Sequence, residues 1–347
     1  MSQLITGIQQ VGIGVADSNE AKHYYKDLFG MNVLVFDDTS SAALMTKYTG
    51  DKVHQRRAIL TMNLCGGGGF ELWQFLSRQP STFQATYGDI GIFGIKIKCF
   101  DTRIAYDLFK NRKNIECSSL MTSPGGNAHF WIKDVYGNFF DIAASDCWFK
   151  KNGSPNGGVY GAVIGVSDMD AALQFYQSVP GLNEVVYDHT SAYADLPSQS
   201  TDIFRRVVLR KPKASCGAFS NLLGHIEIEL VQNLSQPAKQ IFEKRYWGDC
   251  GFIHLCFDVT DMNALKELSE KLGYKFSVDS KNSYAMDTAE GRFCYVEDPD
   301  GTLIELVETH RIPIIKKWNW QIDLTKRKGS KPLPGWMINM LGLNKVK

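Results

Sequence analysis

The sequence lacks several features that would assign it quickly to a class of protein. Its eight cysteines contain no CxxC pair and no spacing typical of a disulfide scaffold. No apolar run reaches the length of a membrane span, and the N-terminus has no basic segment followed by an apolar one. The formal net charge is only +1, so no excess of basic residues indicates a nucleic-acid partner. We therefore expect reduced core thiols, a cytoplasmic location, no membrane span and no nucleic acid.

The most informative stretch is 297–306, which reads Glu-Asp-Pro-Asp-Gly-Thr-Leu-Ile-Glu-Leu. Its Asp-Pro-Asp-Gly segment predicts a tight turn, because proline presets φ and glycine accepts a backbone geometry that other residues resist. The alternation that follows predicts a strand with Leu303 and Glu305 on one face. A carboxylate that points inward needs a partner, so Glu305 indicates a buried cation or a metal ion.

A related stretch occurs earlier in the chain. Residues 134–141 read Asp-Val-Tyr-Gly-Asn-Phe-Phe-Asp, with Asp141 in the place of Glu305. A second repeat has a constant offset, since Asp168 lies 151 residues after Asp17 (168 − 17 = 151) and Asp188 lies 151 after Asp37. The sequence therefore predicts internal duplication.

The repeats divide the chain into four units, each with a strand, a helix and three more strands. With 347 residues, 44% hydrophobic and 22% charged, the chain is long enough for two well-filled globular domains. We expect an N-terminal domain over 7–148, a C-terminal domain over 158–309 and a linker at 151–158. The glycine run 66–69 predicts a hairpin turn, because no lysine or helix start follows it as a phosphate cradle would need.

The last segment, 310–347, does not follow the repeat. It is basic and contains Trp318, Trp320 and Trp336. We expect this segment to form an arm whose tryptophans pack against the core. The alternative is that it contacts a partner or an anionic surface.

Each unit has two marked positions, one near the start of its first strand and one in its last strand. In order, the four units carry Gln10 and Glu71, Gly94 and Asp141, Gly161 and Glu229, and His254 and Glu305. The two strands of a unit can lie side by side, so both residues would face one concavity. A single histidine at a strand start is more often part of a core, but the register of His254 with Glu305 favours a ligand. Nitrogen and carboxylate donors in this arrangement suit a divalent transition ion with open coordination sites.

This layout resembles the vicinal oxygen chelate superfamily, which includes glyoxalase I, bleomycin-resistance proteins, methylmalonyl-CoA epimerase and extradiol dioxygenases. The resemblance covers roughly residues 7 to 308. It implies an α+β fold in which four βαβββ modules form two cup-shaped mixed sheets. It also implies that a cup holds one metal ion, with ligands on the first and last strands of its modules.

Two pairings of the units are open. Pairing of neighbours would place Glu229, His254 and Glu305 in one cup. Pairing of the outer units would join Gln10, Glu71, His254 and Glu305, and would leave Gly94, Asp141, Gly161 and Glu229 in a degenerate cup. We favour outer pairing, because its ligands reproduce the Gln/Glu/His/Glu pattern of some glyoxalase I enzymes. It also leaves one cup with a complete set of ligands, so that only the other cup has lost them.

The resemblance implies a lyase or isomerase that moves a proton next to a carbonyl of a small, partly apolar oxygenated substrate. A divalent ion (Zn, Ni, Co, Mn or Fe) would stabilise an enediolate, and Glu305 or Glu71 would take the proton. Gly12 and Gly14 would leave room for the substrate, and Trp73 and Phe75 would make the pocket partly apolar.

Departures from the family leave alternatives open. Glutathione-using glyoxalases have an arginine where this chain has Gly14 and an asparagine where it has Phe75. An Fe(II) extradiol-type dioxygenase would need a histidine at Gly161, unless His225 or Glu229 replaces it.

His225 and Glu227 could extend a site in the third unit, or simply form a polar edge strand. A non-catalytic protein that sequesters a ligand is the third alternative. Because four units lie in one chain, a monomer can complete a site and a dimer is not required.

Overall fold

The repeated aspartates begin the helices of the molecule. The computed structural model describes residues 3–151, 153–282, 284–318, 320–327 and 331–347. In it each aspartate accepts hydrogen bonds from backbone N–H groups in the first turn of a helix. Such a cap satisfies donors that the helix itself leaves without partners. These residues are Asp17, Asp101, Asp168 and Asp261.

The strands and helices follow the four predicted units. Unit one contains β1 (Ile5–Gly14), α1 (Ser18–Phe29), β2 (Val33–Ser41), η1 (Ala43–Tyr48), β3 (Gln55–Met62) and β4 (Gly69–Phe75). Unit two contains β5 (Gly91–Cys99), α2 (Thr102–Phe109), β6 (Glu116–Cys117), β7 (Met121–Thr122), β8 (Ala128–Lys133) and β9 (Phe139–Ala144). Unit three contains β10 (Asn156–Gly165), α3 (Met169–Ser178), β11 (Glu184–Ser191), β12 (Phe204–Lys211), α4 (Ser220–Leu223) and β13 (Ile226–Asn233). Unit four contains β14 (Gly251–Val259), α5 (Met262–Lys271), β15 (Phe276–Asp279), β16 (Tyr284–Met286), β17 (Ala289–Glu297) and β18 (Leu303–Ile315).

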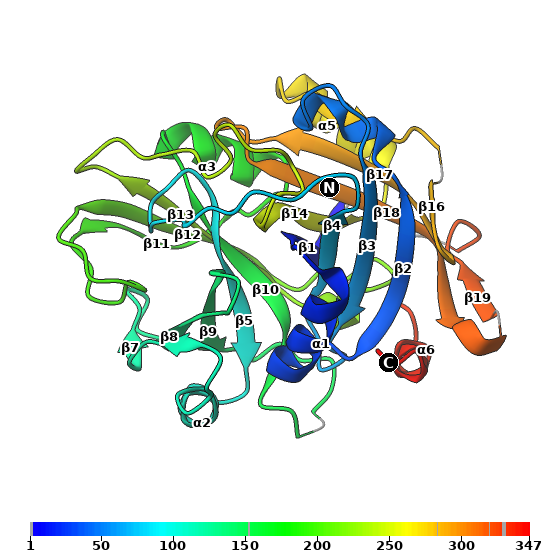
Figure 1. Ribbon diagram of the computed structural model, residues 1–347, viewed down its shortest axis with the longest axis horizontal. Coiled ribbons are helices and arrows are strands. Elements are labelled where there is room, and N and C mark those ends of the chain that lie inside the picture. Colours follow the sequence, from blue (N-terminus) through cyan, green and yellow to red (C-terminus); the bar gives the residue numbers. More distant parts are fainter. Residues whose placement is uncertain (1–2, 152, 283, 319, 328–330) are drawn as a thin grey trace.

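The units join into two mixed sheets that lie next to each other (Figure 1). A ten-stranded sheet has eight of its strands in the order β15-β17-β18-β14-β1-β4-β3-β2, so it unites units one and four. A nine-stranded sheet has eight of its strands in the order β11-β12-β13-β10-β5-β9-β8-β6, and β7 pairs with β8, so it unites units two and three. The outer pairing is therefore the one that the structure adopts, and the α+β fold with two curled sheets is confirmed. We call the hollow face of the ten-stranded sheet the first cup and that of the nine-stranded sheet the second cup.

The sheets cut across the sequence ranges 7–148 and 158–309, because each sheet takes strands from both ranges. The predicted linker 151–158 also differs in part, since β10 begins at Asn156. The glycine run packs closely on this strand: the N–H of Gly68 donates to the carbonyl oxygen of Val159 at 2.7 Å. The turn thus brings the backbones of the two sheets together.

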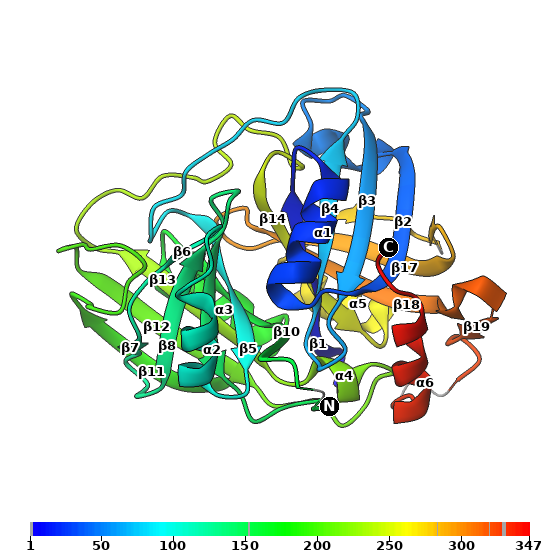
Figure 2. The ribbon, with the colours of Figure 1, turned by 60° about the horizontal axis from the view of Figure 1, so that its bottom comes forward.

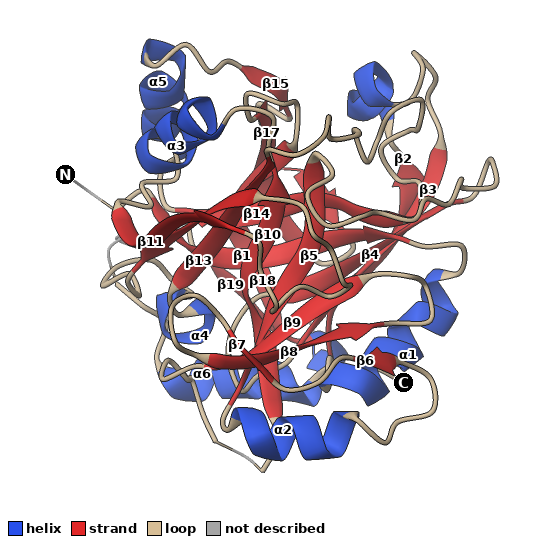
Figure 3. Cartoon of the chain, turned by 90° about the vertical axis from the view of Figure 1, so that its left-hand side faces the viewer, coloured by secondary structure: helices blue, strands red, loops and turns tan. Residues whose placement is uncertain are grey.

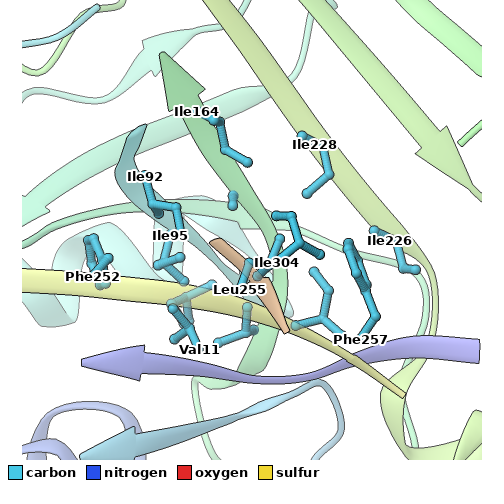
Figure 4. Close-up of a cluster of buried hydrophobic side chains, with 14 of the residues drawn as sticks. Val11, Ile92, Ile95, Ile164, Ile226, Ile228, Phe252, Leu255, Phe257 and Ile304 are labelled. Atoms are coloured by element: carbon cyan, nitrogen blue, oxygen red, sulfur yellow. The ribbon is translucent and has the colours of Figure 1, made fainter. Parts of the chain in front are cut away.

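One large apolar core lies between the two sheets. Alternate residues of the central strands point into it, which leaves the other residues of each strand to face a cup. Figure 4 shows residues of both sheets meeting there, including Val11, Leu255 and Ile304 of the first and Ile95 and Ile228 of the second.

The helices lie in pairs against this core, with α3 beside α5 (Figure 3). Phe175 of α3 packs on Tyr274, just after α5, with ring centroids 4.9 Å apart. Phe29 of α1 and Phe109 of α2 lie 6.0 Å apart. Each pair joins helices of two neighbouring units, so the pairs hold the two sheets together.

The repeated turns are fixed by the same buried contact. Asp298 accepts the N–H of Thr302 at 2.8 Å and the hydroxyl of Tyr176 at 3.0 Å. Asp134 accepts the N–H of Asn138 at 2.8 Å and the hydroxyl of Tyr25 at 2.6 Å. Since these turns lead into β18 and β9, the contact positions the strands that carry Glu305 and Asp141.

The segment after Thr309 continues the first cup instead of leaving it. β18 extends to Ile315 and pairs with β19 (Trp320–Asp323), and η2 (Lys316–Trp318), α6 (Gly335–Met340) and η3 (Leu341–Leu343) complete the segment. Figure 2 shows α6 beside the ten-stranded sheet, with the C-terminus next to β2. The N–H of Leu34 donates to Asn344 at 2.7 Å, which ties the C-terminus to that strand.

Aliphatic side chains hold this arm, not the tryptophans that we expected. Leu333, Ile338 and Leu341 are buried, whereas Trp318 is 70% and Trp336 56% exposed. The expectation that these two tryptophans pack over the core is therefore wrong. Trp320 is half-buried and lies against the apolar cluster of the first cup.

Candidate metal centre

Four adjacent strands of the first cup bring four polar side chains to one point. Gln10 lies on β1, Glu71 on β4, His254 on β14 and Glu305 on β18, and these strands are neighbours in the order β18-β14-β1-β4. All four side chains are buried, and His254 is 0% exposed. Two come from the first unit and two from the fourth, so only the closure of the sheet joins them.

The distances within this cluster are short. The Nε2 atom of His254 lies 3.1 Å from Oε2 of Glu71 and 3.2 Å from Oε2 of Glu305. The amide Nε2 of Gln10 donates to the same two oxygens, at 3.2 Å each. One ligand atom from each of Glu71, His254 and Glu305 lies within 4.8 Å of the others, a spacing that a single metal ion could bridge.

Electrostatics stabilise the charged forms of the histidine and one carboxyl. Burial opposes the charge on His254, but Glu305 and Glu71 outweigh it and raise the pKa of His254 to about 10. Burial likewise opposes ionisation of Glu305, but His254 outweighs it and holds the pKa of that carboxyl below its usual range. The cluster therefore binds a positive charge at its centre, and at neutral pH a proton on His254 supplies it.

Tyr295 is a member of the site that the sequence did not reveal. Its hydroxyl donates to Oε1 of Glu305 at 2.9 Å and lies 3.4 Å from Nδ1 of His254. It orients both side chains from β17, the strand next to β18. The only sequence signal for Tyr295 was its position two residues before Glu297, in a strand whose side chains alternate between two faces.

The two glycines expected to make room for a substrate have other neighbours. A Cβ at Gly12 would overlap the imidazole of His254, coming to 2.6 Å from Nε2, so this glycine makes room for the histidine. A Cβ at Gly14 would overlap the carbonyl oxygen of Asp249. Both glycines shape the site by allowing close packing, and neither opens onto a substrate space.

Two cavities adjoin the cluster. The first, which we call the apolar chamber, has a volume of about 110 Å³ and touches Gln10, Glu71 and Glu305. The second, the side cavity, has a volume of about 80 Å³ and touches Glu71, Tyr295 and Glu305. Trp73 lines the side cavity. Phe75 instead packs against Trp73, with ring centroids 4.7 Å apart.

The second cup has the corresponding carboxylates but surrounds them with basic side chains. Lys96 lies with its Nζ 2.9 Å from Oε2 of Glu229 and 3.5 Å from Oδ2 of Asp141. Arg206 binds Glu229 at 2.7 Å, and Nδ1 of His129 lies 2.7 Å from Oδ1 of Asp141. An ammonium group thus occupies the region between the carboxylates that a metal ion would need.

Gly161 allows this arrangement, because a Cβ there would lie 3.0 Å from Cδ of Lys96. Gly94 instead lies under Trp131, where a Cβ would lie 3.0 Å from the ring. Lys96 follows Gly94 by two residues in an alternating strand, so the sequence contained the signal that it faces the cup.

The alternative ligands of the third unit do not join His254 and Glu305. Glu229 and Glu227 are on β13, in the other sheet, and His225 directly precedes that strand. Glu227 binds Lys96 at 3.0 Å and Arg210 at 2.9 Å. His225 packs on Tyr160, and burial lowers the pKa of its imidazole.

Comparison with known proteins agrees with this architecture. Residues 161–306 match the family described as Glyoxalase/Bleomycin resistance protein/Dioxygenase superfamily. Glyoxalase I from Zea mays aligns with a TM-score of 0.53 at 14% identity, over 87% of this chain and 92% of that chain. A putative dioxygenase from Bacillus subtilis aligns with a TM-score of 0.54 at 12% identity, over 88% of this chain and 86% of that chain.

These structural likenesses establish the fold alone. No curated protein matches the chain in sequence. Among the described residues, no helix combines the length and the apolar character needed to cross a membrane. The matched range 161–306 contains His254 and Glu305, whereas Gln10 and Glu71 lie outside it and reach the site only through the sheet.

Proposed function

Since residues 161–306 match the Glyoxalase/Bleomycin resistance protein/Dioxygenase superfamily, we propose that this chain is a divalent-metal-dependent enzyme of the glyoxalase type. Its reaction would be proton transfer next to a carbonyl of a small, partly apolar oxygenated substrate. The observation that carries this proposal is the convergence of Gln10, Glu71, His254 and Glu305 on one buried point.

The donors of the first cup fit a divalent ion. The set contains one imidazole, two carboxylates and one amide, a mixture that suits zinc, nickel, cobalt, manganese or iron. One buried atom in the cluster, Oε1 of Gln10, has no hydrogen-bond partner. An ion would take the amide oxygen of Gln10, which requires that amide to turn over, and would replace the proton on His254.

A bound ion would supply Lewis acidity toward two neighbouring substrate oxygens. The chain itself would supply the base. Tyr295 and His254 hold Glu305 from two sides, whereas the contacts described for Glu71 are limited to Gln10 and His254. Glu71 also borders both cavities, so it can reach a substrate with little rearrangement. We assign Glu71 as the proton acceptor and Glu305 as the ligand that stays in place.

The competing functions make different demands on this site. An Fe(II) dioxygenase of the extradiol type uses two histidines and one carboxylate. The first cup offers one histidine and two carboxylates, which favours proton transfer over oxygen chemistry. A protein that only sequesters a ligand would not need the buried carboxylates beside the cavity.

The decisive experiment measures ion binding by the full-length protein. We expect about one ion per chain after incubation with Zn²⁺, Ni²⁺, Co²⁺ or Mn²⁺, measured by plasma mass spectrometry. His254→Gln and Glu305→Gln should each weaken binding by at least about tenfold. The matched controls His225→Gln and Glu308→Gln should retain it, because those side chains lie outside the cluster. Full occupancy in His254→Gln would overturn the proposal.

The reaction class is tested with the ion-loaded protein in deuterated water. A 2-hydroxy ketone should exchange the hydrogen next to its carbonyl, and Glu71→Gln should abolish this exchange while the ion remains bound. Oxygen consumption with a catechol would instead establish the dioxygenase. Ligand binding without exchange or oxygen uptake would establish the non-catalytic alternative.

A further inference from the structure

Besides the strands that carry Gln10, Glu71 and Glu305, four segments of the chain line the apolar chamber. β2 and β3 supply one wall, and the hairpin of β16 and β17 supplies another. The remaining walls come from α4, through Leu222, and from the C-terminal arm, through Leu341. α4 belongs to the connection between two strands of the other sheet, so a remote part of the chain closes the chamber.

The charged groups of this chamber are all of one sign. Its lining contains the carboxylates Glu71, Glu290 and Glu305, and among the described residues that line it none is lysine, arginine or histidine. Two arginines at the edge of this region already have partners: Arg311 binds Glu290 at 2.9 Å, and Arg56 in the side cavity binds Asp38 at 2.6 Å. An anionic group of a substrate would therefore enter the chamber without a counter-ion and next to carboxylates.

We infer that the substrate carries an uncharged apolar group that fills this chamber, and that α4 and the C-terminal arm select it. This inference rests on the proposed function, because it assumes that the oxygenated end of the substrate faces Glu71 and Glu305. It excludes substrates whose remote end is anionic, such as thiol-peptide adducts with free carboxylates or phosphorylated carriers.

The size of the chamber limits the group. An engineered protein cavity of about 150 Å³ holds benzene, so a chamber of about 110 Å³ limits the group to at most one ring or a short branched chain. Removing such a group from water is favourable, whereas burying an unpaired carboxylate is strongly unfavourable. The same chamber therefore selects for apolar character and against charge.

Two matched probes test the inference on the ion-loaded, full-length protein. One is 1-(4-methylphenyl)propane-1,2-dione, and the other carries a carboxylate in place of the ring methyl group. Calorimetry should show that the carboxylate form binds at least about tenfold more weakly, which corresponds to about 1.4 kcal/mol. Equal or tighter binding of the carboxylate form, or no binding of either probe, would overturn the inference.

Variants test which residues cause the preference for the uncharged probe. Leu222→Lys should reduce or reverse the preference, because its ammonium would provide the missing counter-ion, and Leu222→Met should preserve the preference. If thermal melting shows that Leu222→Lys does not fold, Leu341→Lys in the C-terminal arm provides a second test. Leu230→Ala, in the core next to the second sheet, controls for general loss of packing and should leave the ratio of affinities unchanged.

Different results would contradict the proposed function and the inference about the substrate. If His254→Gln keeps its ion, the proposed function fails whatever the probes show. If ion binding behaves as expected but the carboxylate probe binds as well as the methyl probe, only the inference about the substrate fails.

Discussion

The two cups of this molecule carry acidic residues at equivalent positions and neutralise them in different ways. In the first cup, Glu71 and Glu305 surround the imidazole of His254. In the second, Asp141 and Glu229 surround the ammonium of Lys96. The fold brings carboxylates together in both places, and buried carboxylates need a cation. The lysine of the second cup is a cation that is fixed to the chain. The histidine of the first cup holds a proton, which is a cation that can be exchanged.

This difference explains why only the first cup is a candidate metal centre. The second cup is also larger and more polar, with a volume of about 850 Å³, so lack of space is not the reason. Burial opposes the charge on Lys96, but Glu229, Glu227 and Asp141 outweigh it and hold the pKa of Lys96 well above its usual range. A metal ion could enter only by displacing this fixed charge.

The strongest test of the comparison removes the fixed cation. Lys96→Met leaves Glu229, Glu227 and Asp141 facing one another without that ammonium, and breaking a buried ion pair from one side costs about 3–5 kcal/mol. We expect a loss of that size in the free energy of unfolding, measured by urea denaturation. Lys345→Met, at an exposed lysine, should change it by less than about 0.5 kcal/mol. Wild-type stability in Lys96→Met would show that the second cup does not depend on its lysine.

A second test uses His129 of the second cup. Burial opposes the charge on His129, but Asp141 and Asp195 outweigh it and raise the pKa of His129 from 6.5 to about 9. The stabilisation from this proton is therefore complete below pH 6.5 and is lost as the pH rises through about 9. We expect wild type to lose roughly 3 kcal/mol more than His129→Gln over that range, as measured by urea denaturation at each pH. Parallel pH profiles of the two proteins would contradict this role.

A smaller effect distinguishes the two glycines that make room for the cations. Gly12→Ala would push on the imidazole of His254, and Gly161→Ala would overlap the carbonyl oxygen of Glu227 and crowd Lys96. Each should cost about 2 kcal/mol of stability, as overpacking does. Only Gly12→Ala should also weaken ion binding, which separates a metal centre from a structural ion pair.

Gly335→Ala serves as the control for both glycine variants, since its Cβ would meet nothing closer than 3.7 Å. It should leave both the melting temperature and ion binding near wild type. Equal ion affinity in Gly12→Ala and Gly161→Ala would remove the distinction between the cups.

Local signals in the sequence were sufficient for the units but not for their assembly. The aspartates that begin the helices and the turns at 134–138 and 298–302 depend on neighbours a few residues away, so their pattern was readable. The alternation around Glu305 correctly placed Leu303 and Ile304 on opposite faces. Tyr295 was missed, because an aromatic residue in a strand is usually part of a core.

The C-terminal arm shows the same limit. Its basic residues and tryptophans suggested an attachment through aromatic rings, but Ile338 and Leu341 hold it and Trp318 stays exposed. Which side chains of an amphipathic segment face inward depends on the surface that receives them, and composition does not describe that surface.

The sequence by itself determined the four units and the eight marked positions, because each follows from residues close together in the chain. Only the tertiary structure decided that β1 pairs with β14 and β5 with β10, and this pairing chose which marked residues meet. The physical reason is that a strand edge can accept more than one partner. The choice between them depends on the burial of the whole core and not on any single motif.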